Sequence, residues 1–343
     1  MASCRSFGVK AGTGLIAMTL FSGAARAELC TTQSQMSTAD RDQLAGAARS
    51  LSLKLEAGDA NGVQAVTVPE YVKDFSGIAY VVTNTAPKIK NAPPTVDQIY
   101  LLDASAIKKQ ADGSVPDAQF FCSLNRSPME TDFVIPGLPP GKYGFAMVNF
   151  PAHPVPWRIS ILFRQEGGQW LLAGLYPQAQ TAAGHDGLWY WKGARDLSAE
   201  KQPWSAWLYY QQAQSLLRPA GFVQSTHLEK LRTEQGKAAP PVLSDGIGPD
   251  TPLVVKGPDG TEYRFTSLDT DDSLAKDKVD IAVHLKAEAI ADPAAARKRN
   301  VAAMTALLTV YPELRKPFHG VWVFADTGGQ GPFATEQAMS EIP

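Results

Sequence analysis

The stretch from Pro156 to Gln178 constrains the fold of this chain most strongly, because it predicts a β-hairpin. From Trp157 to Phe163 apolar side chains recur at alternate positions, as in a strand with one buried face. Gly167-Gly168 follows, and glycine reaches the positive φ of a tight turn at little cost. The return strand is apolar on both faces, which predicts a central position in an antiparallel sheet. One of those faces is predicted to carry Trp170, Leu172, Gly174 and Tyr176.

Aromatic side chains in and after this hairpin allow two interpretations. Trp157, Trp170 and Tyr176 fit ordinary packing in a hydrophobic core. Together with Trp189 they also fit an aromatic-lined pocket for a small apolar ligand.

Residues 1–27 have the features of a secretory signal peptide. Arg5 and Lys10 lead into an apolar run from Ala11 to Phe21, and Ala25-Arg26-Ala27 fits a cleavage site. We therefore expect an exported protein, periplasmic or extracellular, that begins at Glu28 after cleavage. We see no other apolar run long enough to span a bilayer, so we expect no membrane span.

Charge and cysteine content narrow the possible functions. The formal net charge is −2, and residues 1–27 hold basic but no acidic side chains, so the exported chain would be more acidic still. A mildly acidic chain without a basic stripe argues against nucleic-acid binding. Cys4 lies in the predicted signal peptide, and Cys30 and Cys122 predict one disulfide in an oxidising compartment. Two separate buried thiols are the alternative.

The rest of the 343-residue chain divides into segments of different pattern, and the fold class it predicts is α+β. Residues 28–180 read as helices followed by antiparallel strands, and residues 181–235 as a Trp-rich helical segment. Residues 236–252 are rich in Pro, Gly and Ala and predict a linker. Residues 253–343 predict a smaller C-terminal domain with the order β-β-β-α-β.

The first domain resembles a known superfamily. Ser37 to Ala57 predicts a helix that ends in Leu55-Glu56-Ala57-Gly58-Asp59, and the later strands close on the hairpin Ile161 to Leu175. This order resembles the NTF2-like (SnoaL-like, ketosteroid-isomerase-like) superfamily over about residues 37–180. The resemblance implies a curved sheet whose concave side is filled by helices, forming a cone. Enzymes of that superfamily place an Asp or a His-Asp pair inside the cone, and no residue of this chain is matched to that role.

The Trp-rich segment is similar to a single tetratricopeptide-type helical hairpin over about residues 187–219. Ala206, Tyr210, Ala213 and Leu217 fall on one helical face shortly before Pro219. One such hairpin cannot bury its own apolar face, so we expect it to pack against the first domain.

His185-Asp186 is the strongest candidate for a catalytic pair, since a carboxylate that orients a histidine can make it a general base. A polar cap of the loop is the alternative interpretation. No two of the five histidines stand at metal-ligand spacing, so we expect neither a zinc site nor a cofactor.

Asp269, Asp271, Ser273 and Asp280 have the spacing of a calcium-binding loop. Leu274 stands where that loop needs its turn glycine, and the last ligand is Asp rather than Glu. A solvated acidic loop is the alternative interpretation.

Three functions remain open from the sequence. One is an exported non-catalytic protein that binds a small apolar ligand or a protein partner through an NTF2-like cone. The second is an isomerase- or dehydratase-type enzyme that uses a pocket carboxylate or His185. The third is an envelope scaffolding protein whose Trp-rich helices form the contact surface. The position and lining of a cavity would distinguish the first two, and an exposed tryptophan patch would favour the third.

Overall fold

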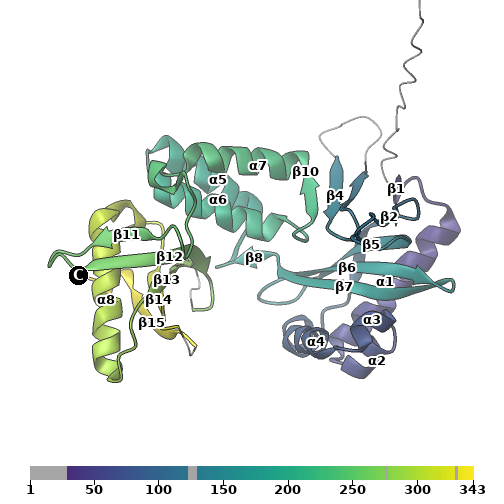
Figure 1. Ribbon diagram of the computed structural model, residues 1–343, viewed down its shortest axis with the longest axis horizontal. Helices are drawn as coiled ribbons and strands as arrows, with labels where there is room; N and C mark the ends of the chain where they lie inside the picture. The colour runs from purple at the N-terminus through teal and green to yellow at the C-terminus, as the bar shows by residue number, and fades with distance from the viewer. Residues whose placement is uncertain (1–28, 123–129, 275–276, 329–330) are drawn as a thin grey trace, which may run out of the picture.

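The computed structural model describes residues 29–122, 130–274, 277–328 and 331–343 (Figure 1). The predicted signal peptide lies outside these residues. The helices and antiparallel strands confirm the α+β class. In the described part of the chain, no helix is both long enough and apolar enough to cross a membrane.

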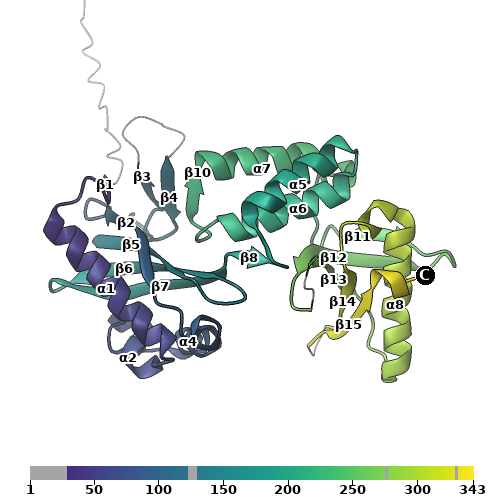
Figure 2. The same ribbon diagram turned by 180° about the vertical axis from the view of Figure 1, so that it is seen from behind.

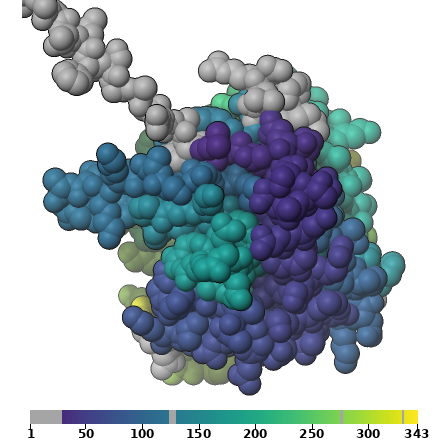
Figure 3. Space-filling view, turned by 90° about the vertical axis from the view of Figure 1, so that its right-hand side faces the viewer, coloured from purple at the N-terminus to yellow at the C-terminus, as the bar shows by residue number. Residues whose placement is uncertain are grey.

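An N-terminal sheet of five antiparallel strands runs in the order β1-β2-β5-β6-β7. Its strands, and the helices between the first two of them, are β1 (Leu29–Thr32), α1 (Thr38–Glu56), α2 (Ala60–Gln64), α3 (Pro69–Val72), α4 (Ser76–Ile89), β2 (Thr95–Asp103), β5 (Lys142–Phe150), β6 (Trp157–Glu166) and β7 (Gln169–Ala179). Helices α1 and α4 bury their apolar stripes on one face of the sheet. Figure 3 shows α1 in purple beside the teal hairpin, where Gln43 Nε2 donates to the Gly168 carbonyl at 3.1 Å.

A small three-stranded sheet covers part of the opposite face. Its strands are β3 (Ala118–Phe121), β4 (Thr131–Ile135) and β10 (Val223–Ser225). Phe120 and Phe133 pack there against Phe145 in a second hydrophobic core. The predicted disulfide between Cys30 and Cys122 is present, with the two Cα atoms 5.2 Å apart, and it joins β1 to the end of β3.

The predicted hairpin is present, but β7 is an edge strand rather than a central one. The segment before α3 covers its edge, because the Leu172 amide donates to the Val66 carbonyl at 2.7 Å and the Leu172 carbonyl accepts from the Val68 amide at 3.0 Å. This pairing uses polar groups that an open edge would expose. Strand β7 is apolar on both faces because a hydrophobic core covers each face, and not because a strand pairs with it on each edge.

A β-bulge also changes the facing of β7. Leu162 pairs with Gly174 and Phe163 with Leu172, so Ala173 is the extra residue. As a result Leu172 lies in the core under α1, whereas Tyr176 lies in the core on the opposite face. The prediction that Trp170, Leu172 and Tyr176 share one face is wrong for this reason.

The middle of the chain forms the predicted helical pair and a third helix. After a short β8–β9 hairpin, these elements are α5 (Gly187–Ala199), α6 (Pro203–Leu217) and α7 (Thr226–Ala238), with β8 at Thr181–Ala182 and β9 at His185–Asp186. Figures 1 and 2 show the three helices between the two large sheets.

The C-terminal sheet runs in the order β11-β12-β13-β14-β15, with β13 and β14 parallel and the other neighbours antiparallel. Its elements are β11 (Leu253–Lys256), β12 (Glu262–Asp271), β13 (Asp280–Lys286), α8 (Pro293–Val310), β14 (Gly320–Asp326) and β15 (Phe333–Ala338), with short 3₁₀ turns at Pro241–Leu243, Pro312–Arg315 and Met339–Glu341. Strand β15 is an addition to the predicted β-β-β-α-β order.

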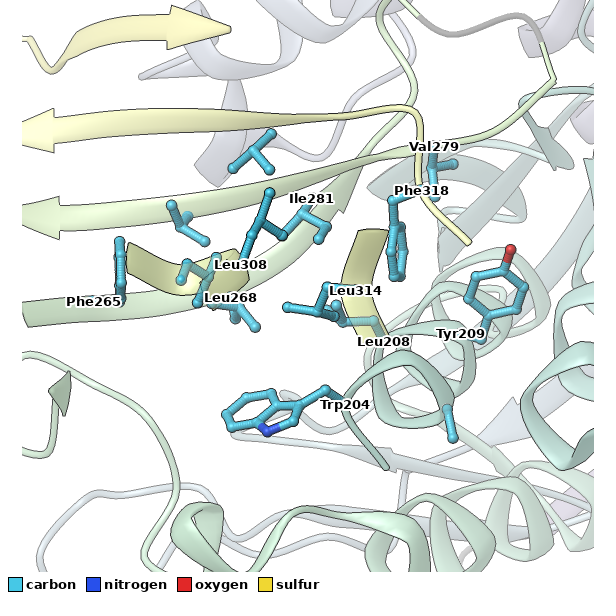
Figure 4. Packing of buried hydrophobic residues seen from close by; sticks show 14 of the residues in the cluster. Trp204, Leu208, Tyr209, Phe265, Leu268, Val279, Ile281, Leu308, Leu314 and Phe318 are labelled. Atoms are coloured by element: carbon cyan, nitrogen blue, oxygen red, sulfur yellow. The ribbon is translucent and has the colours of Figure 1, made fainter. Parts of the chain in front are cut away.

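The helical pair shares its core with this C-terminal sheet, not with the first domain as expected. Trp204, Leu208 and Tyr209 of α6 belong to the same hydrophobic cluster as Phe265 and Ile281 of the sheet (Figure 4). The physical reason is that α6 is apolar around most of its circumference. One face packs on α5, and the other is buried against the C-terminal sheet. The predicted linker also packs on this cluster through Leu243 and Ile247.

We predict that Gly187→Val weakens the contact between α5 and α6. A Cβ at Gly187 would lie 2.5 Å from Leu217 Cγ and 3.2 Å from the Ala213 carbonyl oxygen, so the helices would have to separate. We expect a loss of about 1–3 kcal/mol in unfolding free energy, measured by urea denaturation. Gly236→Val in α7, where nothing lies within 4 Å of an added Cβ, controls for the lower helix propensity of valine. Equal losses in the two variants would contradict the close-approach explanation.

Candidate functional site

A cavity of about 610 Å³ lies between the N-terminal sheet and helices α5 and α7. It opens on the face of the sheet opposite α1, because Phe145 and Met147 line it while Ala146 and Val148 pack under α1. Helices α1 and α4 fill the side of the sheet on which the cone was predicted. The cavity therefore lies on the other side, and its volume is typical of a small-molecule site.

One part of the cavity wall is apolar. Strands β2, β4 and β5 and helices α5 and α6 supply it, through Tyr100, Phe133, Phe145, Met147, Trp191 and Leu217. Phe133 packs edge-to-face on both Tyr100 and Phe145, with ring centroids 5.2 and 5.0 Å apart. Such packing holds the rings in place, so this wall is preformed.

The polar part of the wall is mainly basic. Arg158, Lys192, Arg195 and Lys230 line the cavity together with His227, and Asp97 is the one acidic side chain in the lining. This contrasts with the whole chain, whose formal charge is −2. A concentration of cations in a recessed site attracts an anion.

Arg158 projects from β6 on the face opposite Trp157 and has neutral partners. Its Nη2 donates to Gln178 Oε1 at 2.7 Å and to the Leu216 carbonyl at 3.0 Å. Its Nε is buried and has no hydrogen-bond partner among the described residues. Burial lowers the pKa of Arg158, and the charge of Asp97 opposes that shift. A buried cation with an unused donor is costly unless an anionic acceptor reaches it.

Arg195 is held differently, in a network with Glu234 of α7. Its Nε and Nη2 donate to the two carboxylate oxygens of Glu234 at 2.8 and 2.9 Å, and Trp191 Nε1 donates to the same carboxylate at 2.8 Å. The hydrogen bond from Arg195 holds the pKa of Glu234 below its usual value. This pairing fixes α5 to α7. The other cavity cations, Arg158, Lys192 and Lys230, form no ion pair among the described residues.

The four aromatic residues predicted to line a pocket lie in different places. Trp157 and Trp170 pack at the edge of the core under α1, and the Lys88 ammonium lies 4.8 Å from the Trp157 ring centroid. Tyr176 packs edge-to-face on Phe222 in the core on the other face. Trp189 is 43% exposed at the start of α5. None of the four lines the cavity described above.

His185 and Asp186 take separate partners. The Asp186 carboxylate accepts from the Trp189 amide at 2.8 Å and caps the N-terminus of α5. The His185 ring stacks on Trp189, with the centroids 3.7 Å apart. The pair thus has the local structural role that was the alternative interpretation of these residues.

The calcium-like spacing does not correspond to a loop. Asp269 and Asp271 lie in β12 and Asp280 begins β13, directly opposite Asp271. Asp269 is hydrogen-bonded by Gln211 of α6. The spacing of a calcium loop requires the chain to wrap around one ion, and a β-ladder cannot do so.

The sequence pattern did not identify the cavity residues. The signal available was Arg158, which shares its face of β6 with Ser160 and Leu162, both buried. A cation on an otherwise buried face indicates either an ion pair or a ligand site. Comparison of the chain with protein-family models, with curated proteins and with solved structures finds no match.

Proposed function

We propose that this protein is an exported, non-catalytic binding protein for a small amphipathic anion, such as a carboxylate with an apolar body. The observation that supports it most is Arg158, a half-buried cation in the cavity wall that has no acidic partner and whose buried Nε has no hydrogen-bond partner among the described residues. The anionic group would accept from Arg158, and the aromatic wall would hold the apolar part. Export is supported by the Cys30–Cys122 disulfide, since disulfides persist in oxidising compartments.

The lining favours binding over the enzyme alternative. An isomerase or dehydratase of the NTF2-like kind needs a carboxylate or a histidine close to the substrate. Asp97 and His227 are the lining residues with such groups, and they come from β2 and α7, at different walls of the cavity. The basic side chains offer charge complementarity instead. The scaffolding alternative gains less support, because Trp191 and Trp204 are buried, Trp207 is half-buried and Trp189 is the one exposed tryptophan of this segment.

We predict that Arg158→Gln weakens binding of an anionic apolar probe by about 10- to 100-fold, since a hydrogen bond to a charged group contributes roughly 1.5–3 kcal/mol. The probe is 8-anilinonaphthalene-1-sulfonate, titrated by fluorescence. Decanoate should displace it from the wild type much better than decanol, which has the same chain without the charge.

Arg49→Gln is the matched control, because Arg49 is exposed on α1, on the other side of the sheet. This variant should bind the probe like the wild type. Near-UV circular dichroism of both variants checks that the probe reports the cavity and not a loosened core. Equal affinity of Arg158→Gln and the wild type would overturn the assignment of the cavity. Equal displacement by decanoate and decanol would overturn the anionic character of the ligand.

A further inference from the structure

Three ionisable side chains meet at one end of the C-terminal sheet. Asp280 begins β13, His319 immediately precedes β14, and Glu336 lies on β15. The parallel register of β13 and β14 places the starts of these two strands side by side. One ligand atom of each side chain lies within 4.8 Å of the others. Zinc holds nitrogen and oxygen ligands at about 2.0–2.2 Å in tetrahedral geometry, which places neighbouring ligand atoms roughly 3.4 Å apart. The three groups therefore have to move closer together by about an ångström to share an ion.

Asp280 gives this cluster a buried, incompletely satisfied carboxylate. The residue is 0% exposed, and its Oδ1 lies 2.8 Å from His319 Nδ1. Its Oδ2 is buried and has no hydrogen-bond partner among the described residues. Burial raises the pKa of Asp280, whereas the hydrogen bond with His319 lowers it. An isolated buried carboxylate oxygen is costly, and a cation placed beside it removes that cost.

Gly320 lies close to both carboxylates. A Cβ at this position would lie 2.7 Å from the Gln337 carbonyl oxygen and 3.1 Å from both Asp280 Oδ1 and Glu336 Oε1, so a larger residue would crowd the cluster. The His319 side chain is 40% exposed, so the cluster is reachable from solvent. The site thus has a buried acid at its base and a histidine that solvent can reach.

We propose that Asp280, His319 and Glu336 bind a divalent transition-metal ion of the zinc class. One imidazole nitrogen and two carboxylate oxygens form a donor set that such ions accept, and water completes it. Calcium fits less well, because it takes six to eight oxygen ligands and rarely an imidazole. The ion would join β13, β14 and β15 at the edge of the sheet, independently of the anion cavity.

A second histidine–carboxylate pair on the same sheet serves as a control. His284 Nδ1 lies 2.9 Å from Asp326 Oδ2, and both side chains are 43% exposed. These residues lie on β13 and β14, whereas Asp280 and His319 lie at the starts of the same two strands. They do not belong to a three-ligand cluster among the described residues. His284→Asn therefore removes an imidazole from a similar pair without touching the proposed site.

The test is isothermal titration calorimetry of Zn²⁺ into untagged, chelator-treated protein. We expect one equivalent bound by the wild type and by His284→Asn, and at least about tenfold weaker binding by His319→Asn, since loss of an outer-shell partner alone typically weakens metal binding by 10- to 100-fold. Glu336→Gln, at a partly exposed position, provides a second variant should His319→Asn not fold. Zn²⁺ should raise the melting temperature of the wild type and of His284→Asn but not that of His319→Asn.

Three outcomes would overturn the proposal. One is a wild type that binds no Zn²⁺ at micromolar concentration. The others are binding by His319→Asn and Glu336→Gln that equals that of the wild type, and Ca²⁺ binding as tight as Zn²⁺ binding.

Discussion

Phe318→Ala should cost about 3–5 kcal/mol in unfolding free energy, the range for deleting a large buried aromatic side chain. Phe318 is buried at the junction of the C-terminal sheet and α6, where its ring meets that of Tyr209 at 5.7 Å, edge to face (Figure 4). The Tyr209 hydroxyl donates to the adjacent Pro317 carbonyl at 3.2 Å. Because the two parts share one core, the substitution should destabilise both α5–α6 and the sheet. Urea denaturation followed by hydrogen exchange measures both effects.

Phe121→Ala makes the same chemical change at a side chain that is 52% exposed on β3. It should alter stability by no more than about 0.5 kcal/mol. In Phe318→Ala, the C-terminal sheet could lose protection from hydrogen exchange while α5 and α6 keep wild-type protection. That result would show that the two parts fold separately.

Removing the Cys30–Cys122 disulfide should lower the unfolding free energy by about 2–4 kcal/mol, because the bond closes a loop with a sequence separation of 92 and restricts the unfolded chain. In the native state the bond also fastens β1, which has only β2 as a neighbour in its sheet. The double variant Cys30→Ser/Cys122→Ser, compared with the oxidised wild type by urea denaturation, measures the loss.

A reducing agent supplies the control for this measurement. It should lower the denaturation midpoint of the wild type to near that of the double variant and leave the double variant unchanged. An oxidised wild type with two titratable thiols would contradict the disulfide.

Local patterns in the sequence predicted local structure well. The alternation from Trp157 to Phe163 and the Gly167-Gly168 turn predicted β6, β7 and their connection, because these depend on neighbouring residues. The face on which each side chain of β7 lies could not be predicted, because the bulge at Ala173 depends on how β7 pairs with β6. The NTF2-like resemblance remains a prediction. The partner of the helical pair was predicted wrongly, since an apolar helix face does not specify which surface covers it.

The two candidate sites needed long-range information. The cavity draws on β2, β6, α5 and α7, which are far apart in the chain. For the proposed metal site the sequence does carry a usable signal. Strands predicted at Val279 and Gly320 with one helix between them form a crossover unit, and parallel pairing then brings Asp280 beside His319. Spacing rules for metal loops miss such a site because its ligands come from separate strands.

The cavity takes its walls from two hydrophobic cores, with Phe133 and Phe145 in one and Trp191 and Leu228 in the other. An occupant would therefore touch both halves of the molecule at their seam. If the occupant binds more tightly when the two halves are in contact, then by thermodynamic linkage its binding stabilises that contact by the same free energy. Ligand concentration would then shift the equilibrium toward the arrangement in which the halves are in contact, and the radius of gyration in solution would report occupancy without any probe attached to the ligand.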